Sequence, residues 1–277
     1  MKIITLLENH SCDDALINKH GLSVYIETGD KKILVDVGPD DSFIKNAQKL
    51  NVDLSAVDYL VISHGHYDHG GGLSYFLNVN DRARVVMHRR TLKEYFAQQP
   101  SGDFRHIGLN YTAPIDERFI LLEENYKLEN NIDVIMDYDP TGFVPEGNQV
   151  LYERGADGEL TGDKFKHEIA LLIAENGKNV FITGCSHSGI GNMVRRVQRC
   201  RGDINIDYVI GGFHLFNPSA KSLEKKDRID ALIDELAPFA STVFYTGHCT
   251  GTSGYQYLKQ HMKNEIHEIH SGTVIEI

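Results

Sequence analysis

The sequence predicts an α/β fold for this chain of 277 residues, because strand and helix patterns alternate along it. Four short apolar segments each run into a loop that contains glycine and histidine, and apolar residues at helical spacing follow each loop. The loops carry His64, His187, His214 and His248. Sites in α/β sheets gather at the carboxyl ends of strands, so we expect the four loops to meet at one end.

The remaining elements follow from the periodicity of the apolar residues. Thr28–Gly29–Asp30–Lys31 predicts a hairpin turn between two strands. The predicted strands are residues 2–8, 22–28, 32–37, 57–62, 84–87, 179–183, 208–210 and 242–245. The predicted helices cover residues 43–50, 73–77, 91–97, 190–197, 229–236 and 255–262.

Two segments with little periodicity interrupt this pattern, at about residues 98–117 and 138–166. Long irregular segments inside a compact domain often act as lids or binding loops, and ordinary surface loops are the alternative. We therefore predict a single domain over residues 1–277, with these segments as lids or insertions.

The composition argues against several classes of partner. The net charge is -11 and the pI is about 5.7, whereas proteins that bind nucleic acids or anionic membranes need a basic face. The start lacks a signal peptide, and no apolar run approaches the roughly 20 residues of a membrane helix. We expect a cytoplasmic protein with a small-molecule anionic substrate. The four cysteines are predicted to be free thiols: Cys12, Cys185, Cys200 and Cys249.

The densest chemistry lies in His64–Gly65–His66–Tyr67–Asp68–His69. Four potential ligands so close together are too crowded for one open ion, but they suit two neighbouring ions. His64 and His66 would bind one ion, and Asp68 and His69 the other. Each ion then lacks a ligand, which His187 and His248 are the natural residues to supply. The alternative is a histidine-rich turn whose side chains only form hydrogen bonds.

Several other residues have two possible roles. His214 is either a ligand or a group that supports the ligands from behind. Cys185 and Cys249 are either thiolate ligands or small buried residues that pack near the loops. The other histidines are predicted to be surface or packing residues: His10, His20, His88, His106, His261, His267 and His270.

The His64–x–His66–x–Asp68–His69 pattern resembles the hallmark loop of the metallo-β-lactamase superfamily, and the resemblance covers nearly the whole chain. It implies a four-layer α/β/β/α sandwich of two mixed β-sheets, with the metals in a cleft along one edge. Val35–Asp36–Val37–Gly38 matches the strand end whose aspartate supports the family's metal site, and Cys185 is assigned a similar supporting place. Smaller motifs, among them Gly247–His248–Cys249–Thr250–Gly251, look like the branch of dihydropterin-methyl-ribofuranosylaminobenzene-phosphate synthase.

The chain departs from the family pattern at two places. The superfamily has an aspartate in the Gly–Asp loop where this chain has Gly184–Cys185–Ser186–His187. The resemblance therefore implies that the bridging aspartate is absent and that His187 replaces a missing histidine. The branch is expected to have an Asp–Glu pair where this chain has His167–Glu168. His167 is thus left to bind metal, to bind substrate or to begin a strand.

These observations predict a metal-dependent hydrolase that uses hydroxide bound to a dinuclear metal site on a small anionic substrate of the phosphoester type. The cofactors would be two divalent transition-metal ions, with Zn²⁺ first and Mn²⁺ or Fe²⁺ as alternatives. One alternative function is a pterin-type synthase or transferase related to methanopterin biosynthesis. Another is a non-catalytic metal-containing binding protein or sensor.

The predicted reaction assigns roles to individual side chains. Asp68 would orient the attacking water, and His214 would deliver a proton to the leaving group. The helix start at Ser188 and Gly189 would hold an anionic substrate group through backbone N–H donors. Arg105, Lys164 and Lys166 would add positive charge from the two irregular segments.

Overall fold

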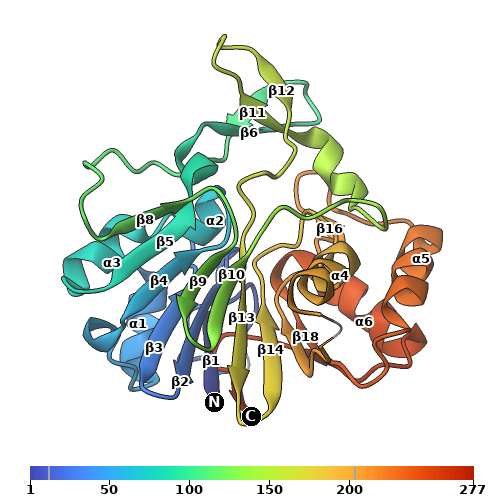
Figure 1. The fold of residues 1–277 in the computed structure, drawn as a ribbon. Helices are drawn as coiled ribbons and strands as arrows, with labels where there is room; N and C mark the ends of the chain where they lie inside the picture. Colours follow the sequence, from blue (N-terminus) through green and yellow to red (C-terminus); the bar gives the residue numbers. More distant parts are fainter. Residues whose placement is uncertain (12, 203) are drawn as a thin grey trace. The chain divides into compact units, whose positions relative to one another are not determined.

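The structure is a computed structural model that describes residues 1–11, 13–202 and 204–277. The chain divides into two compact units, each with its own mixed β-sheet and hydrophobic core (Figure 1). Unit 1 comprises Met1–Glu94, Ile107–Glu123 and Ile269–Ile277, and unit 2 comprises Tyr95–His106 and Glu124–Glu268. The single domain predicted over residues 1–277 stays a prediction.

Unit 1 contains a seven-stranded sheet in the order β20-β1-β2-β3-β4-β5-β8. Its strands are β1 (Lys2–Leu7), β2 (Ser23–Thr28), β3 (Lys31–Val35), β4 (Tyr59–Ile62), β5 (Arg84–His88), β8 (Phe119–Leu122) and β20 (Val274–Glu276). Pairing is antiparallel from β20 to β3, which includes the predicted hairpin, and parallel from β3 to β8. The carboxyl ends of β3, β4 and β5 therefore lie along one edge of the sheet.

The helices of unit 1 bury the apolar faces that the sequence spacing predicted. They are α1 (Ser42–Lys49), α2 (Tyr67–Gly70), α3 (Leu73–Val79) and the 3-10 turns η1 (Leu54–Ala56) and η2 (Arg89–Leu92). Phe43 and Ala47 of α1 and Phe76 of α3 belong to one buried cluster with Leu34 and Leu60 of the strands. Burial of each phenylalanine contributes roughly 1.5–3 kcal/mol. α2 and the loop before it follow the end of β4.

Unit 2 contains a second seven-stranded sheet, in the order β19-β18-β15-β14-β13-β10-β9. Its strands are β9 (Tyr126–Glu129), β10 (Ile132–Ile135), β13 (Ala170–Glu175), β14 (Lys178–Ile182), β15 (Tyr208–Ile210), β18 (Val243–Thr246) and β19 (Ile266–Glu268). Pairing is antiparallel from β9 to β14 and parallel from β14 to β19. The three histidine loops after β14, β15 and β18 therefore lie side by side at one edge, as predicted. The fourth loop follows β4 in unit 1.

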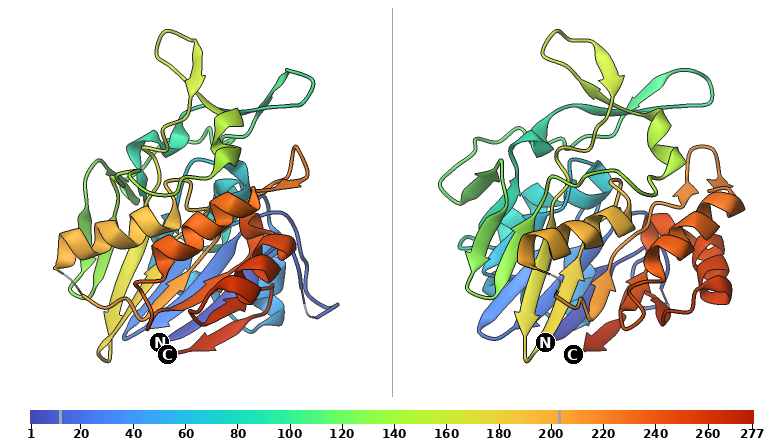
Figure 2. Two further views of the ribbon diagram at one scale, coloured as in Figure 1. Left: turned by 90° about the vertical axis from the view of Figure 1, so that its right-hand side faces the viewer. Right: turned by 45° about the vertical axis from the view of Figure 1, so that its right-hand side comes forward.

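Helices on the strands' connections complete the core of unit 2 (Figures 1 and 2). They are α4 (Ile190–Arg201), α5 (Lys226–Leu236), α6 (Thr252–His261), η3 (Glu146–Val150) and η4 (His248–Thr250), and a short hairpin joins β16 (Phe216–Asn217) to β17 (Ser222–Leu223). Met193, Leu232 and Leu258, one from each long helix, are fully buried in one cluster with Phe181 and Phe244 of the strands. The predicted helical spacing is confirmed for all three helices.

The two irregular segments contribute strands to one small sheet in unit 2, which the sequence analysis did not predict. Its order is β12-β11-β6-β7, from β6 (Tyr95–Gln98), β7 (Phe104–His106), β11 (Leu151–Arg154) and β12 (Leu160–Gly162). The helix predicted over residues 91–97 is wrong beyond Leu92, because β6 pairs with β11. Figure 2 shows the β11–β12 hairpin projecting from the rest of unit 2. A role of these segments as lids stays a prediction.

Two further expectations concern the whole chain. Within the described ranges, no helix has both the length and the apolar character that a membrane span requires. Within the described residues no disulfide involves Cys185, Cys200 or Cys249, as predicted, and Cys12 lies outside the described residues.

Candidate metal centre

The four ligands predicted from the His64–His69 loop are gathered together in unit 1. His64 and His69 are fully buried, and His66 and Asp68 are nearly so. The ring of His64 lies 4.2 Å from that of His69 and 4.6 Å from that of His66, measured between centroids. The loop that follows β4 therefore presents a compact set of imidazoles and one carboxylate.

Asp36, at the end of β3, holds this loop from behind. Its Oδ1 accepts a hydrogen bond from the backbone N–H of Ser63 at 2.8 Å. Its Oδ2 accepts one from the hydroxyl of Ser63 at 2.7 Å and lies 2.6 Å from Nδ1 of His69. Asp36 adopts a left-handed backbone conformation with φ 60°, which turns its carboxylate under the neighbouring strand end. The aspartate thus occupies the supporting position that the family resemblance implied.

These contacts determine which nitrogen of each ring carries the hydrogen. The single hydroxyl proton of Ser63 goes to Asp36, so Nδ1 of His64, 2.9 Å from that hydroxyl oxygen, must be the donor. Nδ1 of His69 is likewise the donor, because a carboxylate only accepts. In neutral rings the lone pair of His64 and of His69 is then on Nε2. Metal-ligating histidines are held in this way by their second nitrogen.

His20 is a neighbour of the site that the sequence analysis missed. We expected a surface or packing residue, but its Nε2 lies 3.2 Å from Oδ2 of Asp68. The backbone N–H of Leu22 also donates to the carbonyl of Asp68 at 3.2 Å, which ties the two segments together. The two segments are far apart in the sequence, so only the fold brings His20 to the carboxylate.

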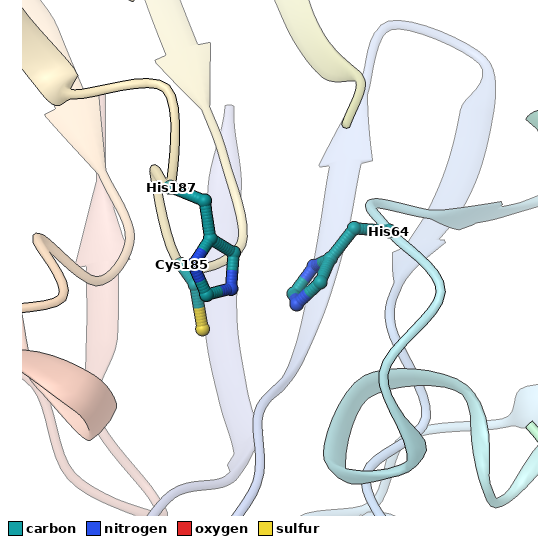
Figure 3. Close-up of side chains that lie close together, drawn as sticks. All are labelled: His64, Cys185 and His187. Atoms are coloured by element: carbon teal, nitrogen blue, oxygen red, sulfur yellow. The ribbon is translucent and has the colours of Figure 1, made fainter. Parts of the chain in front are cut away.

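His187, on the loop after β14 in unit 2, is held through its Nδ1 in the same way as His64 and His69. Its Nδ1 lies 2.9 Å from Oδ1 of Asn148, and Nδ2 of Asn148 donates to the carbonyl of His187 at 2.7 Å. Because Oδ1 only accepts, Nδ1 is the donor and the lone pair of the neutral ring is on Nε2. The ring of Phe165 stacks on His187 with centroids 4.4 Å apart. Figure 3 shows His187 and Cys185 on this loop, and His64 on the loop after β4.

The predicted anion site at the start of α4 is already used by the protein. The carboxylate of Glu168 accepts the backbone N–H groups of His187 at 2.7 Å and of Ser188 at 2.8 Å, and the N–H of Gly189 donates to the carbonyl of Ser186. The assignment of the Ser188 and Gly189 N–H groups to a substrate is therefore wrong. Burial raises the pKa of Glu168 above its ordinary value, and the hydrogen bonds from this loop oppose that shift without cancelling it. The sequence did not predict this role of Glu168, which entered only as part of a family motif.

Two cysteines and a histidine converge at the ends of three adjacent strands of unit 2. The ligand atoms of Cys185, His214 and Cys249 all lie within 4.8 Å of one another. Burial raises the pKa of the Cys249 thiol, but contacts with Cys185 and His214 and the nearby His248 outweigh it, so that the pKa is well below its ordinary value. His248 itself is buried in η4.

His167 and Asp163 form a second buried pair in unit 2. Nε2 of His167 lies 3.0 Å from Oδ2 of Asp163, and both side chains are 1% exposed. Of the three roles left open for His167, beginning a strand is excluded, since β13 begins at Ala170. Asp163 was not singled out from the sequence, because nothing in the local pattern indicates that it meets a histidine four residues later.

A cavity of about 540 Å³ in unit 2 has His187 and Ser188 in its wall. Lys164 and Lys166 line it and are exposed, and neither forms an ion pair with a residue in the described ranges. Phe165, between them, also lines the cavity, but it is buried and stacks on the ring of His187. Arg105 is exposed on β7 and is not among the residues that line this cavity. Of the three predicted cations, Lys164 and Lys166 line the cavity, and Arg228 lines it as well.

Comparisons with known proteins agree with this architecture. A family model described as the metallo-beta-lactamase superfamily matches residues 18–186. A 7,8-dihydropterin-6-methyl-4-(β-D-ribofuranosyl)-aminobenzene-5'-phosphate synthase from Methanocaldococcus jannaschii is 29% identical and covers 100% of this chain and 96% of its own length. An uncharacterised protein from the same organism is 31% identical, with 99% of this chain and 100% of that protein covered.

A solved structure resembles the chain along its whole length. The crystal structure of Tm1679, a metal-dependent hydrolase of the β-lactamase superfamily, superimposes with a TM-score of 0.83 at 27% identity, covering 100% of this chain and 99% of that one. This similarity and the family match confirm the predicted fold class, the metallo-β-lactamase fold.

Proposed function

Because the chain belongs to the metallo-β-lactamase superfamily, we propose that it is a metal-dependent hydrolase acting on a small anionic substrate of the phosphoester type. The observation that carries this proposal is the cavity of unit 2, where His187 shares a wall with Lys164 and Lys166. A predicted ligand beside two lysines without ion-pair partners in the described ranges suits a negatively charged reacting group. The cavity volume of about 540 Å³ also falls in the range of small-molecule sites.

Two divalent transition-metal ions are the proposed cofactors, with zinc first and manganese or iron as alternatives. The proposed ligands are His64, His66, Asp68 and His69 in unit 1 and His187 and His248 in unit 2. The hydrogen bonds of Asp36, Ser63 and Asn148 support this fit, since each leaves Nε2 of its histidine as the atom with the lone pair. Such ions, when bound, supply Lewis acidity and lower the pKa of water.

The protein's own side chains would bind the substrate, exclude water and orient the attacking group. Lys164 and Lys166 would hold the anionic group and keep it beside His187. The apolar side chains of Val144 and Phe165 in the cavity wall would exclude water from the bound substrate. Asp68, contacted by His20, would orient the attacking group.

A synthase or transferase is the second candidate, and one specific observation favours it. The similarity to the archaeal dihydropterin-type phosphate synthase extends over the full length of this chain. The same cationic cavity suits a phosphorylated substrate whose group passes to an organic acceptor instead of to water. The two candidates differ in the nucleophile and share the anion site.

A panel of phosphomonoesters, phosphodiesters, lactones and thioesters, assayed with zinc- or manganese-loaded protein, tests the proposal. We expect turnover of phosphorylated members, with oxygen from ¹⁸O-labelled water in the product. Turnover only when an organic acceptor is added, without label, would replace the hydrolase by the synthase. A flat response with and without acceptors would overturn both and favour a binding protein or sensor.

Replacement of both cavity lysines tests the anion site itself. The Lys164→Ala/Lys166→Ala variant should raise KM for the active phosphorylated substrate by at least about tenfold, because each charged hydrogen bond contributes about 1.5–3 kcal/mol. Its metal content should not change. Lys127→Ala, an exposed lysine on β9 outside the cavity, is the matched control and should keep the original KM. Equal KM values for the two variants would contradict the assignment.

A further inference from the structure

The turn over residues 163–168 of unit 2 places an aromatic ring directly on a proposed metal ligand. Phe165 lies in the middle of this turn, between Lys164 and Lys166. Its ring is parallel to the imidazole of His187, with 6° between the ring planes and 4.4 Å between the centroids. Both residues are buried, with Phe165 7% and His187 1% exposed. The phenyl ring therefore covers one face of the imidazole.

Phe165 reaches this place through a backbone conformation that bulky residues rarely adopt. Its φ is 51°, in the left-handed region, where a phenylalanine is strained. The backbone N–H of Phe165 donates to Oδ1 of Asp163 at 2.7 Å, and its carbonyl accepts the N–H of Glu168 at 3.0 Å. Strain of this kind persists only where the surroundings hold the residue in place, and it gathers at functional sites. The turn, and not burial alone, thus determines where the phenyl ring lies.

The same turn also holds the backbone of His187. The carboxylate of Glu168 accepts the N–H groups of His187 at 2.7 Å and of Ser188 at 2.8 Å. Asn148 holds the imidazole at its edge, because its Oδ1 lies 2.9 Å from Nδ1. His187 is therefore fixed at its backbone, at one ring nitrogen and at one ring face. Together these three contacts set the direction in which Nε2 points.

We propose that Phe165 is a positioning residue for His187, whose ring plane it sets and whose ligand role it supports. An imidazole that binds a divalent ion carries part of the ion's positive charge, and the face of a phenyl ring attracts positive charge. An aliphatic side chain of similar volume would bury a similar surface but would offer neither the flat face nor this attraction. The inference rests on the proposed function only through the assignment of His187 as a ligand.

The turn combines two tasks that a substitution can separate. Lys164 and Lys166 line the cavity where the anionic group is proposed to bind, and Phe165 stacks on the ligand between them. The hydrogen bonds that shape the turn involve the backbone of Phe165 and not its ring. A change of the ring alone should therefore affect His187 and leave the two lysines in place.

Metal affinity, measured with zinc by chelator competition, tests the role of the ring without an activity assay. Phe165→Leu should weaken zinc binding about threefold to tenfold, which corresponds to the loss of one aromatic stacking contact. Phe165→Tyr keeps the flat ring and should restore the affinity. Phe96→Leu is the matched control, because Phe96 on β6 is 8% exposed and does not line the cavity. It should bind zinc like the original protein.

Kinetics provide a readout that a packing role would not move. In Phe165→Leu the kcat for the active phosphorylated substrate should fall at least about tenfold, because a small displacement of a reacting group slows turnover strongly. KM should stay within about twofold, since Lys164 and Lys166 keep their places in the turn. Urea unfolding of Phe165→Leu and Phe96→Leu gives the packing contribution of each ring for comparison.

Three results would overturn the proposal. The first is equal zinc affinity in Phe165→Leu and Phe96→Leu, and the second is an equal loss of affinity in Phe165→Tyr and Phe165→Leu. The third is full zinc content in His187→Ala, which would remove the ligand assignment itself. Zinc loss in His187→Ala with full affinity in Phe165→Leu would overturn the positioning role alone. The affinity measurements need no substrate, so failure of the proposed hydrolase reaction is a separate outcome.

Discussion

Nδ1 of His69 lies 2.6 Å from Oδ2 of Asp36, and both side chains are fully buried. This contact joins the end of β3 to α2, which follows β4, and leaves the lone pair of the neutral imidazole on Nε2. Asp36 also accepts two hydrogen bonds from Ser63. One carboxylate therefore orients His69 directly and His64 through the serine hydroxyl.

Replacement of Asp36 by asparagine should weaken metal binding about 10–100-fold. The amide NH₂ would take the place of one carboxylate oxygen and would face a donor, either the backbone N–H of Ser63 or the Ser63 hydroxyl and Nδ1–H of His69. Chelator competition measures the affinity. Asparagine tolerates the left-handed backbone at this position. Asp137→Asn is the control, since Asp137 has φ 58° but is exposed, and it should bind metal like the original protein.

The Asn148→Ala variant should also lose metal affinity, by about tenfold or more, because Nδ1 of His187 would lose the partner that orients its ring. Bound metal per chain and the Kd from competition provide the measurement. Gln149→Ala changes the next residue, which is exposed and also lines the cavity. If both variants bind metal equally well, Asn148 does not position a ligand.

Gly189→Ala should destabilise unit 2 by about 3 kcal/mol or more. Gly189 has φ 84°, and a Cβ atom there would be 1.9 Å from the carbonyl oxygen of Phe143. Gly102 has φ 91° with open space around it, so Gly102→Ala carries only the backbone penalty of about 1–2 kcal/mol. Urea unfolding of the two variants separates the contribution of the close contact from that of the backbone. Equal losses would show that the loop at Gly189 moves aside.

The Asp40 carboxyl should contribute to the free energy of unfolding at neutral pH, and this contribution should be lost in acid. Burial raises its pKa, but hydrogen bonds from Lys19 and Ser42 outweigh burial and hold the pKa below the ordinary value of 3.8. Because the folded pKa is lower than the unfolded one, the stabilisation is complete above 3.8 and is lost as the pH falls through the folded pKa. For a partly exposed pair it amounts to at most about 1 kcal/mol.

Urea unfolding of the original protein and of Asp40→Asn at a series of pH values measures this contribution. The difference in unfolding free energy should be largest near neutral pH and should vanish in strong acid. In a Lys19→Met background the same comparison should show a smaller difference. A difference that stays constant down to strong acid would contradict the assignment.

Much of the fold could be predicted from local pattern alone. The apolar spacing of Phe43 and Ala47 in unit 1, and of Met193 and Leu258 in unit 2, predicts helices that the structure contains, because burial of one face is a local property of the sequence. The helix predicted through Tyr95–Gln98 failed for the opposite reason. That segment pairs with β11, more than fifty residues later, and no local pattern records such a partner.

The sequence by itself determined the donor chemistry of this protein: which loops carry histidine, aspartate and cysteine, and that each loop follows a strand. Only the tertiary structure decided which atoms of those residues are available. Hydrogen bonds from Asp36, Ser63 and Asn148 assign the lone pairs of His64, His69 and His187 to Nε2. Glu168 occupies the N–H group of Ser188, one of the two that the sequence assigned to a substrate, and strand register brings Cys249 to Cys185. Residue types are local, whereas hydrogen-bond direction and the meeting of distant loops depend on long-range packing.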